Sequence, residues 1–270
     1  MATLTETAPL PAPAPRVSVV DGLRQSATLA WRTLVQIRHN PWELGDFSFQ
    51  PIMFVLLFTY VFGGAIAAST GEYLTFALPG IIVMNMLFVT MYVGLGLNTD
   101  LTKGVFDRLR SLPVARWAPL AGRITADLVK QAWSILLLLG VGFLLGFRVG
   151  TSFLGLLAAV VLILVFALAF SWVSVLVGLL AKDPEKVQLF GFTALFPVTF
   201  VSNVFVPTVT MPGWLQAVVK VNPVSILSDA ARGLIVGGQV AAPVIQTLLW
   251  VVALLLIFVP LSIRAFRRRV

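Results

Sequence analysis

Long apolar runs alternate with short polar segments along most of this chain, and the pattern predicts six membrane-spanning helices. A helix needs about 20 mainly apolar residues to cross the hydrocarbon core of a bilayer. Pro197 and Asn203 interrupt the fifth run, which is the weakest of the six. We expect the spans at about 48–67, 74–97, 121–147, 153–181, 187–206 and 243–263.

The segment before the first span predicts a helix that lies along the membrane surface. Apolar residues recur there at helical spacing, whereas Arg24 and Arg32 fall off that stripe. Such a pattern is typical of an interfacial amphipathic helix, here over residues 21–40, with Pro41 turning the chain into the bilayer. This helix either anchors the first span or takes part in coupling. The apolar stripe consists of Leu23, Ala27, Ala30, Leu34 and Ile37.

Both ends of the chain lie outside the apolar pattern. Residues 1–20 are rich in Pro and Ala and predict a disordered tail. We expect no cleavable signal peptide, because arginines separate this tail from the first apolar run. The other end of the chain finishes in a basic cluster at 264–269.

The connection at 207–238 is too apolar for a solvated loop and too rich in Pro and Gly to span the bilayer. We predict two short re-entrant helices in the outer leaflet, resting on protein, with Trp214 at the interface. The residues that mark this outer segment are Pro207, Pro212, Trp214, Asn222, Pro223 and Arg232.

Composition agrees with an all-α integral membrane protein. Of the 270 residues 59% are hydrophobic and 11% are charged, whereas soluble domains carry about a quarter charged residues. The net charge of +8 does not indicate nucleic-acid binding, because the basic residues lie at the edges of apolar runs. The chain has no cysteine, which excludes disulfides and thiolate metal sites.

The distribution of Lys and Arg predicts that both termini are cytoplasmic. With six spans, 16 of these residues fall on the side of the termini and 3 on the other side. Positive residues collect on the cytoplasmic side of membrane proteins. The expected arrangement is therefore a multi-pass protein of a cytoplasmic membrane with both termini inside the cell.

A polar stretch at 100–113 separates the second and third spans and predicts a short amphipathic helix outside the bilayer. Leu101, Val105, Leu109 and Leu112 follow one another at i, i+4, i+8 and i+11, and Pro113 ends the pattern. From composition alone, an ordinary solvated loop is an equal alternative.

Four regions of the chain resemble ABC-2 type exporter permeases, and most of all the daunorubicin/doxorubicin-resistance (DrrB-like) group. They are the polar stretch just described, the start of span one with Pro51 and Phe58–Gly63, the start of span two at Tyr73–Gly80, and the outer segment. Their order along residues 20–270 agrees with that family. Lys103 and Asp107 stand where many relatives carry glutamates.

The resemblance implies a type V exporter fold and an ATP-driven mechanism. Two permeases, as a homodimer, would associate with two ABC ATPase subunits that bind ATP and Mg. This chain lacks the G-x-x-x-x-G-K-[ST] pattern, so it is expected to hold no cofactor and no ATPase site of its own. The 100–113 segment would be the coupling helix seated on the ATPase. Its expected contact residues are Asp100, Lys103, Gly104, Phe106, Asp107, Arg108, Leu109, Arg110 and Pro113.

We expect no catalytic or metal site in the chain, because His39 is the only histidine and has no clustered partners. Asp183 and Glu185 flank Pro184 in a tight turn that is a possible second ATPase contact. The alternative function is an ion-coupled secondary transporter, which needs a buried ionisable group. Asp127, with Arg123 and Lys130 nearby, is the candidate for that group. A scaffolding protein is a third alternative.

The expected cargo is apolar or amphipathic, either a drug-like polyketide or a lipid. Aromatic faces bind such molecules without strict geometry, and polar residues within the spans either line a cavity or join helices. The expected cargo pathway comprises Phe58, Phe62, Asn85, Phe88, Phe196, Phe200 and Asn203.

Overall fold

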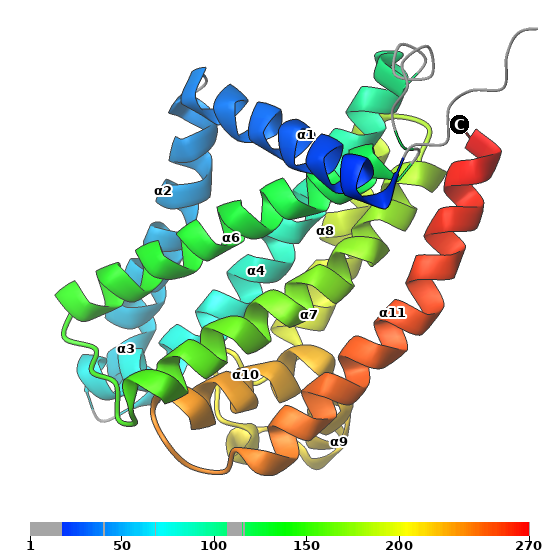
Figure 1. Cartoon of the computed structure of the whole chain (residues 1–270). Helices are drawn as coiled ribbons and strands as arrows, with labels where there is room; N and C mark the ends of the chain where they lie inside the picture. Colours follow the sequence, from blue (N-terminus) through cyan, green and yellow to red (C-terminus); the bar gives the residue numbers. More distant parts are fainter. Residues whose placement is uncertain (1–17, 40, 68, 107–114, 116, 270) are drawn as a thin grey trace, which may run out of the picture.

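The computed structural model describes residues 18–39, 41–67, 69–106, 115 and 117–269, and within these residues every regular element is helical. The chain forms one bundle of long helices with a group of short helices at one end (Figure 1). In chain order the elements are α1 (Val19–His39), α2 (Pro41–Leu57), the π-helix η1 (Phe58–Phe62), α3 (Gly63–Ile66), α4 (Thr70–Thr102), α6 (Ala118–Leu144), α7 (Phe153–Leu180), α8 (Pro184–Phe200), η2 (Thr208–Thr210), α9 (Gly213–Val221), α10 (Pro223–Ile235) and α11 (Ala241–Arg269).

Side chains near the helix starts explain several of these boundaries. Ser69, Ser152 and Asp183 each accept a hydrogen bond from the backbone N–H three residues later, and so cap α4, α7 and α8. Proline is the first residue of α8 and α10, where its missing N–H costs no hydrogen bond.

Five helical segments of the described chain are long and apolar enough to cross a membrane: Ser48–Ile66, Thr70–Thr102, Ala118–Leu144, Phe153–Leu180 and Ala241–Arg269. They agree with five of the six predicted spans. The structure differs from the prediction for the fifth span, 187–206. Helix α8 has 17 residues and ends at Phe200, and residues 201–206 are not helical.

Tertiary hydrogen bonds account for this early end of α8. The Asn222 side-chain amide donates to the carbonyl oxygens of Val198 and Val201, at 2.7 and 2.6 Å, which are among the last carbonyls of the helix. The Tyr73 hydroxyl donates to the Phe205 carbonyl oxygen at 3.1 Å. Residues 201–206 therefore find partners in α4 and in the turn between α9 and α10.

Helix α4 lies at the centre of the bundle, packed against α6, α7, α8 and α10. Its buried residues run from Tyr73 to Asn98, whereas most of α11 is exposed. Two glycines allow α7 to approach it. A Cβ at Gly94 would lie 2.1 Å from the Ser174 carbonyl oxygen, and one at Gly178 would lie 2.3 Å from the Gly94 carbonyl oxygen. The two backbones are thus in direct contact, as small residues permit in membrane helices.

Helix α1 packs across α6 through small residues, which differs from the predicted arrangement. Among the α1 side chains described, at 20–35, the buried positions are Gly22, Ser26 and Ala30, of which Ala30 belonged to the predicted stripe. Leu23 is 58% exposed, and its apolar neighbours Val20 and Trp31 are exposed too. The helix therefore has two non-polar sides, one against protein and one facing outward. It begins at Val19, two residues before the predicted start.

The two ends of the bundle are different in character. Helix α1 and the last turn of α11 lie at one end, and α3, α9 and α10 lie at the opposite end (Figure 1). The two short helices expected in the outer segment are present as α9 and α10. We call the end with α1 the α1 end and the other the α9 end.

We predict that Gly94→Ala lowers the free energy of unfolding by about 1–3 kcal/mol, because the added methyl group must push α7 away from α4. The measurement is the melting temperature of the detergent-solubilised protein. Gly140→Ala is the control, since a Cβ there meets nothing within 4 Å. Equal melting temperatures for the two variants would contradict the close contact.

Candidate functional site

The polar stretch between α4 and α6 starts as a continuation of α4 and then turns. Asp100 lies in the last helical turn, and its carboxylate forms an ion pair with Arg123 of α6. Lys103 and Gly104 form the turn, and Gly104 has φ +67°, which favours glycine. The predicted helix 100–113 thus begins inside α4. Arg123 was expected near Asp127, and its ion pair with Asp100 adds a partner from α4.

Phe106 is the last residue described before a gap, and it is buried. It is 7% exposed, and its ring meets the ring of Phe266 of α11 edge-on, with centroids 5.6 Å apart. Phe106 therefore attaches the start of this segment to the bundle, and its contact with an ATPase stays a prediction. Asp107, Arg108, Leu109, Arg110 and Pro113 lie outside the described residues.

The end of the polar stretch is attached to α1. The backbone N–H of Ala115 donates to the Gln25 side-chain oxygen at 2.9 Å. A Cβ at Gly22 would lie 2.5 Å from the Trp117 ring. The indole therefore packs directly on the α1 backbone at Gly22, which has no side chain. Helix α1 thus contacts both α6 and the residues that lead into it.

The last turn of α7 is held by two side chains from other helices. The buried Asn98 amide donates to the carbonyl oxygens of Gly178 and Ala181, at 2.9 and 2.8 Å. Arg269, at the end of α11, donates to the same two oxygens and to that of Leu179. These carbonyls have no partner within their own helix, so the two side chains tie α4, α7 and α11 together.

The short connection from α7 to α8 forms the tight turn that the sequence predicts. Asp183 accepts hydrogen bonds from the Lys186 backbone N–H at 3.0 Å and from its ammonium group at 2.8 Å. These bonds hold the pKa of the Asp183 carboxyl below its usual range. A contact between this turn and an ATPase stays a prediction.

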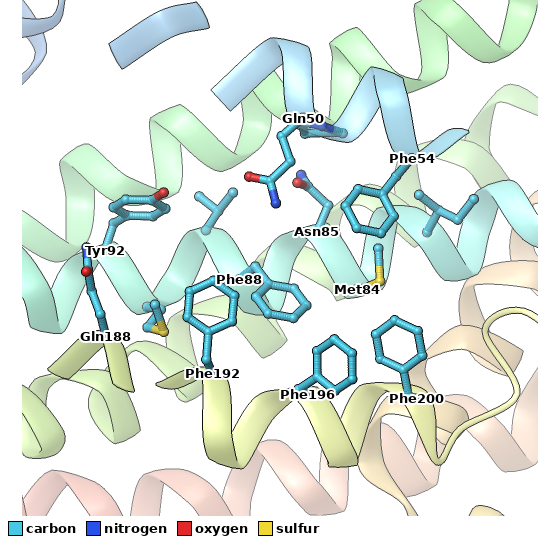
Figure 2. A pocket seen from close by; sticks show the side chains of 14 residues that line it. Gln50, Phe54, Met84, Asn85, Phe88, Tyr92, Gln188, Phe192, Phe196 and Phe200 are labelled. Atoms are coloured by element: carbon cyan, nitrogen blue, oxygen red, sulfur yellow. The ribbon is translucent and has the colours of Figure 1, made fainter. Parts of the chain in front are cut away.

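A cleft of about 120 Å³ lies between α2, α4 and α8. Figure 2 shows Phe192, Phe196 and Phe200 projecting from α8, with Phe88 of α4 and Phe54 of α2 facing them. Four of the seven predicted cargo residues line it, namely Asn85, Phe88, Phe196 and Phe200. The full lining comprises Gln50, Pro51, Phe54, Ile81, Met84, Asn85, Phe88, Val89, Met91, Tyr92, Gln188, Phe192, Phe196 and Phe200.

Polar groups occupy one part of the cleft and aromatic rings the other. Gln50 and Asn85 turn toward each other in its middle, and Tyr92 and Gln188 lie at one end (Figure 2). The Asn85 amide also donates to the Ser134 hydroxyl of α6 at 2.8 Å, which fixes its orientation. No described lining residue is charged. The cleft can therefore hold a molecule with an apolar flat part and a neutral polar part.

The other three predicted cargo residues lie outside the cleft. Asn203 is 4% exposed and its amide donates to Asp229 at 2.8 Å, so it serves the packing of α10. Phe58 and Phe62 stack on each other along η1, with centroids 5.3 Å apart. Sequence reasoning missed Gln50, Met84 and Gln188, because their spacing does not distinguish them from helix surface residues.

The outer segment is held by a half-buried cation. Arg232 of α10 forms an ion pair with Asp229 at 2.7 Å and donates to the Phe76 carbonyl oxygen of α4 at 3.0 Å. Its guanidinium carbon also lies 4.0 Å from the centre of the Phe76 ring. Asn222 caps α10, and Trp214 on α9 is 71% exposed. Pro207, Pro212 and Pro223 stand at or beside the starts of η2, α9 and α10.

Asp127 is buried in α6 with Lys130, at 3.9 Å, as its ion-pair partner. Near it, Gln131 donates to Thr90 of α4 at 2.6 Å. Within the described residues no group of three His, Cys, Asp or Glu could hold a metal ion.

The model of the ABC-2 type transporter family matches residues 24–236. The chain belongs to the ABC-2 type transporter family. It is thus a multi-pass membrane permease of the exporter type, and permeases of this family work with an ABC ATPase.

Individual relatives of this permease carry drug-resistance names. It is 41% identical to the daunorubicin resistance ABC transporter permease protein DrrB1 of Streptomyces coeruleorubidus, over 90% of this chain and 87% of that protein. It is 29% identical to the probable doxorubicin resistance ABC transporter permease protein DrrC of Mycobacterium tuberculosis, over 81% of this chain and 79% of that protein.

We predict that Asn98→Ala lowers the free energy of unfolding of the permease by about 1–3 kcal/mol, because α7 carbonyls lose a buried donor. Thermal melting in detergent measures the change. Thr102→Ala is the matched control, since Thr102 is exposed on the same helix and its hydroxyl donates only to the Thr99 carbonyl oxygen. If Asn98→Ala melts at the same temperature as the control, the hydrogen bonds from Arg269 are enough to hold the end of α7.

Proposed function

We propose that this permease exports amphipathic molecules with a flat aromatic part from the cytoplasm or inner leaflet, driven by a separate ABC ATPase. The observation that carries the proposal is the cleft between α2, α4 and α8, with phenylalanine rings on three helices and uncharged polar groups beside them. Rings bind flat molecules by stacking, which tolerates variation in the cargo. The drug-resistance names of the relatives support this class of cargo.

Helix α4 connects the cleft to the region where the ATPase would bind. It carries Asn85 and Phe88 in the cleft, and it ends at Thr102 beside the polar stretch. With a rise of 1.5 Å per residue, Phe88 and Asp100 are about 18 Å apart along the helix axis. A push at 100–113 would therefore reach the cleft through one continuous helix.

The ion pair between Asp100 and Arg123 would make α6 move with the end of α4. The guanidinium of Arg123 lies over Gly96, where a Cβ would be 1.7 Å from one of its nitrogens. Helix α1 would join this movement, because Gln25 holds Ala115 and Gly22 lies under Trp117. These contacts favour a coupling role for α1 over simple anchoring.

The working complex would contain two permeases, as a homodimer, and two ATPase subunits that bind ATP and Mg. Phe192, Phe196 and Phe200 of the cleft are 40% to 52% exposed in the single chain, so a second copy would cover them. The α1 end would face the cytoplasm of a bacterial cell, since it holds the α11 end with its three arginines at 267–269. Both termini would then be cytoplasmic.

Transport assays of the purified complex test this function. The permease is co-expressed with the ABC ATPase of its operon and reconstituted in lipid vesicles, with daunorubicin and a fluorescent phospholipid as probes. We expect both proteins to co-purify, and ATP hydrolysis and daunorubicin transport to require both. ATP-independent transport of daunorubicin that follows a proton gradient would overturn the proposal in favour of ion coupling through Asp127. If the complex transports the phospholipid and not daunorubicin, the cargo is a lipid and not an aromatic drug-like molecule.

We predict that Phe196→Ala raises the KM for daunorubicin transport about 2- to 10-fold, because one stacking ring of the cleft is lost. The measurement is initial transport rate against daunorubicin concentration. Phe190→Ala is the matched control, since Phe190 lies on the same helix, is 55% exposed and does not line the cleft. Equal KM values for the two variants would remove the cleft from the cargo path.

A further inference from the structure

Two rows of phenylalanine rings lead from the cleft toward the α9 end and meet there. The first row follows α2 and η1 through Phe54, Phe58 and Phe62, with centroids 5.9 and 5.3 Å apart. The second follows α8 and the chain after it, through Phe196 and Phe200 to Phe205, with centroids 4.2 and 5.3 Å apart.

The rows start as separate walls of the cleft and end in contact. Phe54 and Phe200 both line the cleft (Figure 2). One step further along each row, the rings of Phe58 and Phe205 stack with centroids 4.1 Å apart and planes 20° apart. Phe205 is 7% exposed, and neither ring of the pair belongs to the cleft lining, so the stacked pair lies just beyond the cleft at the end of both rows.

The two partners are held in different ways. Phe205 is fixed through its backbone, because its carbonyl oxygen accepts a hydrogen bond from the Tyr73 hydroxyl of α4. Phe58 begins the π-helical turn η1, which holds more residues per turn than an α-helix and occurs often at functional sites. A change of this turn to α-helical geometry would alter the direction in which the Phe58 ring points.

We propose that the stacked pair of Phe58 and Phe205 is the outer gate of the cleft, and that cargo leaves between the two rings. This inference rests on the proposed function of the cleft. Movement of α4 pulls Tyr73 and with it Phe205, while η1 lets Phe58 turn aside. The aromatic part of the cargo replaces the ring-to-ring contact as it passes, so the gate opens without exposing apolar rings to an empty gap.

Reversible cross-linking tests the gate in the complete transporter. The permease contains no cysteine, so Phe58→Cys together with Phe205→Cys introduces the only two thiols in this chain. The double variant is combined with a cysteine-free partner ATPase in inside-out vesicles. A short bifunctional methanethiosulfonate reagent joins the two thiols, and a reducing agent releases them. Mass spectrometry verifies the cross-link, and daunorubicin is the transported probe.

The cross-linked complex is expected to bind daunorubicin but to transport it at least about tenfold more slowly, because closure of the path limits turnover. Reduction should restore the rate. Leu249→Cys with Val252→Cys, on the exposed face of α11, is the matched control and should transport normally after the same treatment. If the complex with the verified cross-link between positions 58 and 205 transports daunorubicin at the full rate, the gate proposal is wrong, whereas the proposed function is unaffected. Absence of daunorubicin transport by the unmodified complex would instead overturn the proposed function, and the gate with it.

A second variant keeps the test decisive if the cysteine pair does not fold. Phe205→Leu retains an apolar side chain but removes the ring, and should raise ATP-independent leak of daunorubicin through the complex several-fold. Phe190→Leu, away from the cleft, should leave the leak unchanged. Equal leak through both variants would show that the ring pair is not the barrier.

Discussion

Backbone groups that lie in a bilayer cannot turn to water, so each helix end within this bundle needs a partner from the protein. Two asparagines meet much of this need. Asn98 donates to carbonyls at the end of α7, and Asn222 donates to carbonyls at the end of α8 while its oxygen accepts from Val224. The four donated bonds join segments that lie 21 to 83 residues apart in the chain. The ends of α7 and α8 are therefore also the points where the bundle is tied together.

These ties place the parts of the transporter relative to one another. Asn98 is two residues from Asp100, so the clamp on α7 and the ion pair to α6 lie next to the polar stretch. Asn222 holds the chain just before Phe205 and begins α10, whose Arg232 reaches back to α4. Helix α4 thus has a connection to neighbouring helices at each end, and the cleft lies between these connections. A rigid central element with attachments at both ends can transmit a displacement without bending.

Much of the fold followed from the sequence because a membrane makes the hydrophobic pattern unusually direct. Five spans, the two short outer helices and the turn at Asp183 agree with prediction. The end of α8 could not be predicted, since it depends on Asn222, which lies 22 residues beyond Phe200 in the chain. The face of α1 that packs on α6 was missed for a related reason. Its glycine and serine positions carry little hydrophobic signal, whereas the exposed Leu23 and Trp31 carry a strong one.

The candidate site was predicted in part. Aromatic residues in α8 and Asn85 in α4 were found because rings and amides stand out within an apolar run. Phe106 and Asn203 were placed in contact with partner or cargo, but the structure buries both among other helices. Composition cannot distinguish a side chain that faces a partner from one that faces its own bundle. The stacking of Phe58 on Phe205 likewise involves a π-helical turn, which the hydrophobic pattern of the sequence does not predict.

The contact of α4 with α7 at Gly94 and Gly178 has a consequence for how such a permease can change over evolution. The contact depends on the absence of side chains, and either glycine would be displaced by a single added carbon. The cleft depends on side chains that project into open space, where one ring or amide can be exchanged for another. Under the proposed function, mutations in the cleft can therefore alter the range of exported molecules while Gly94 and Gly178 stay constant. Selection by new toxic compounds would act on the cleft positions and be blocked at the two glycines.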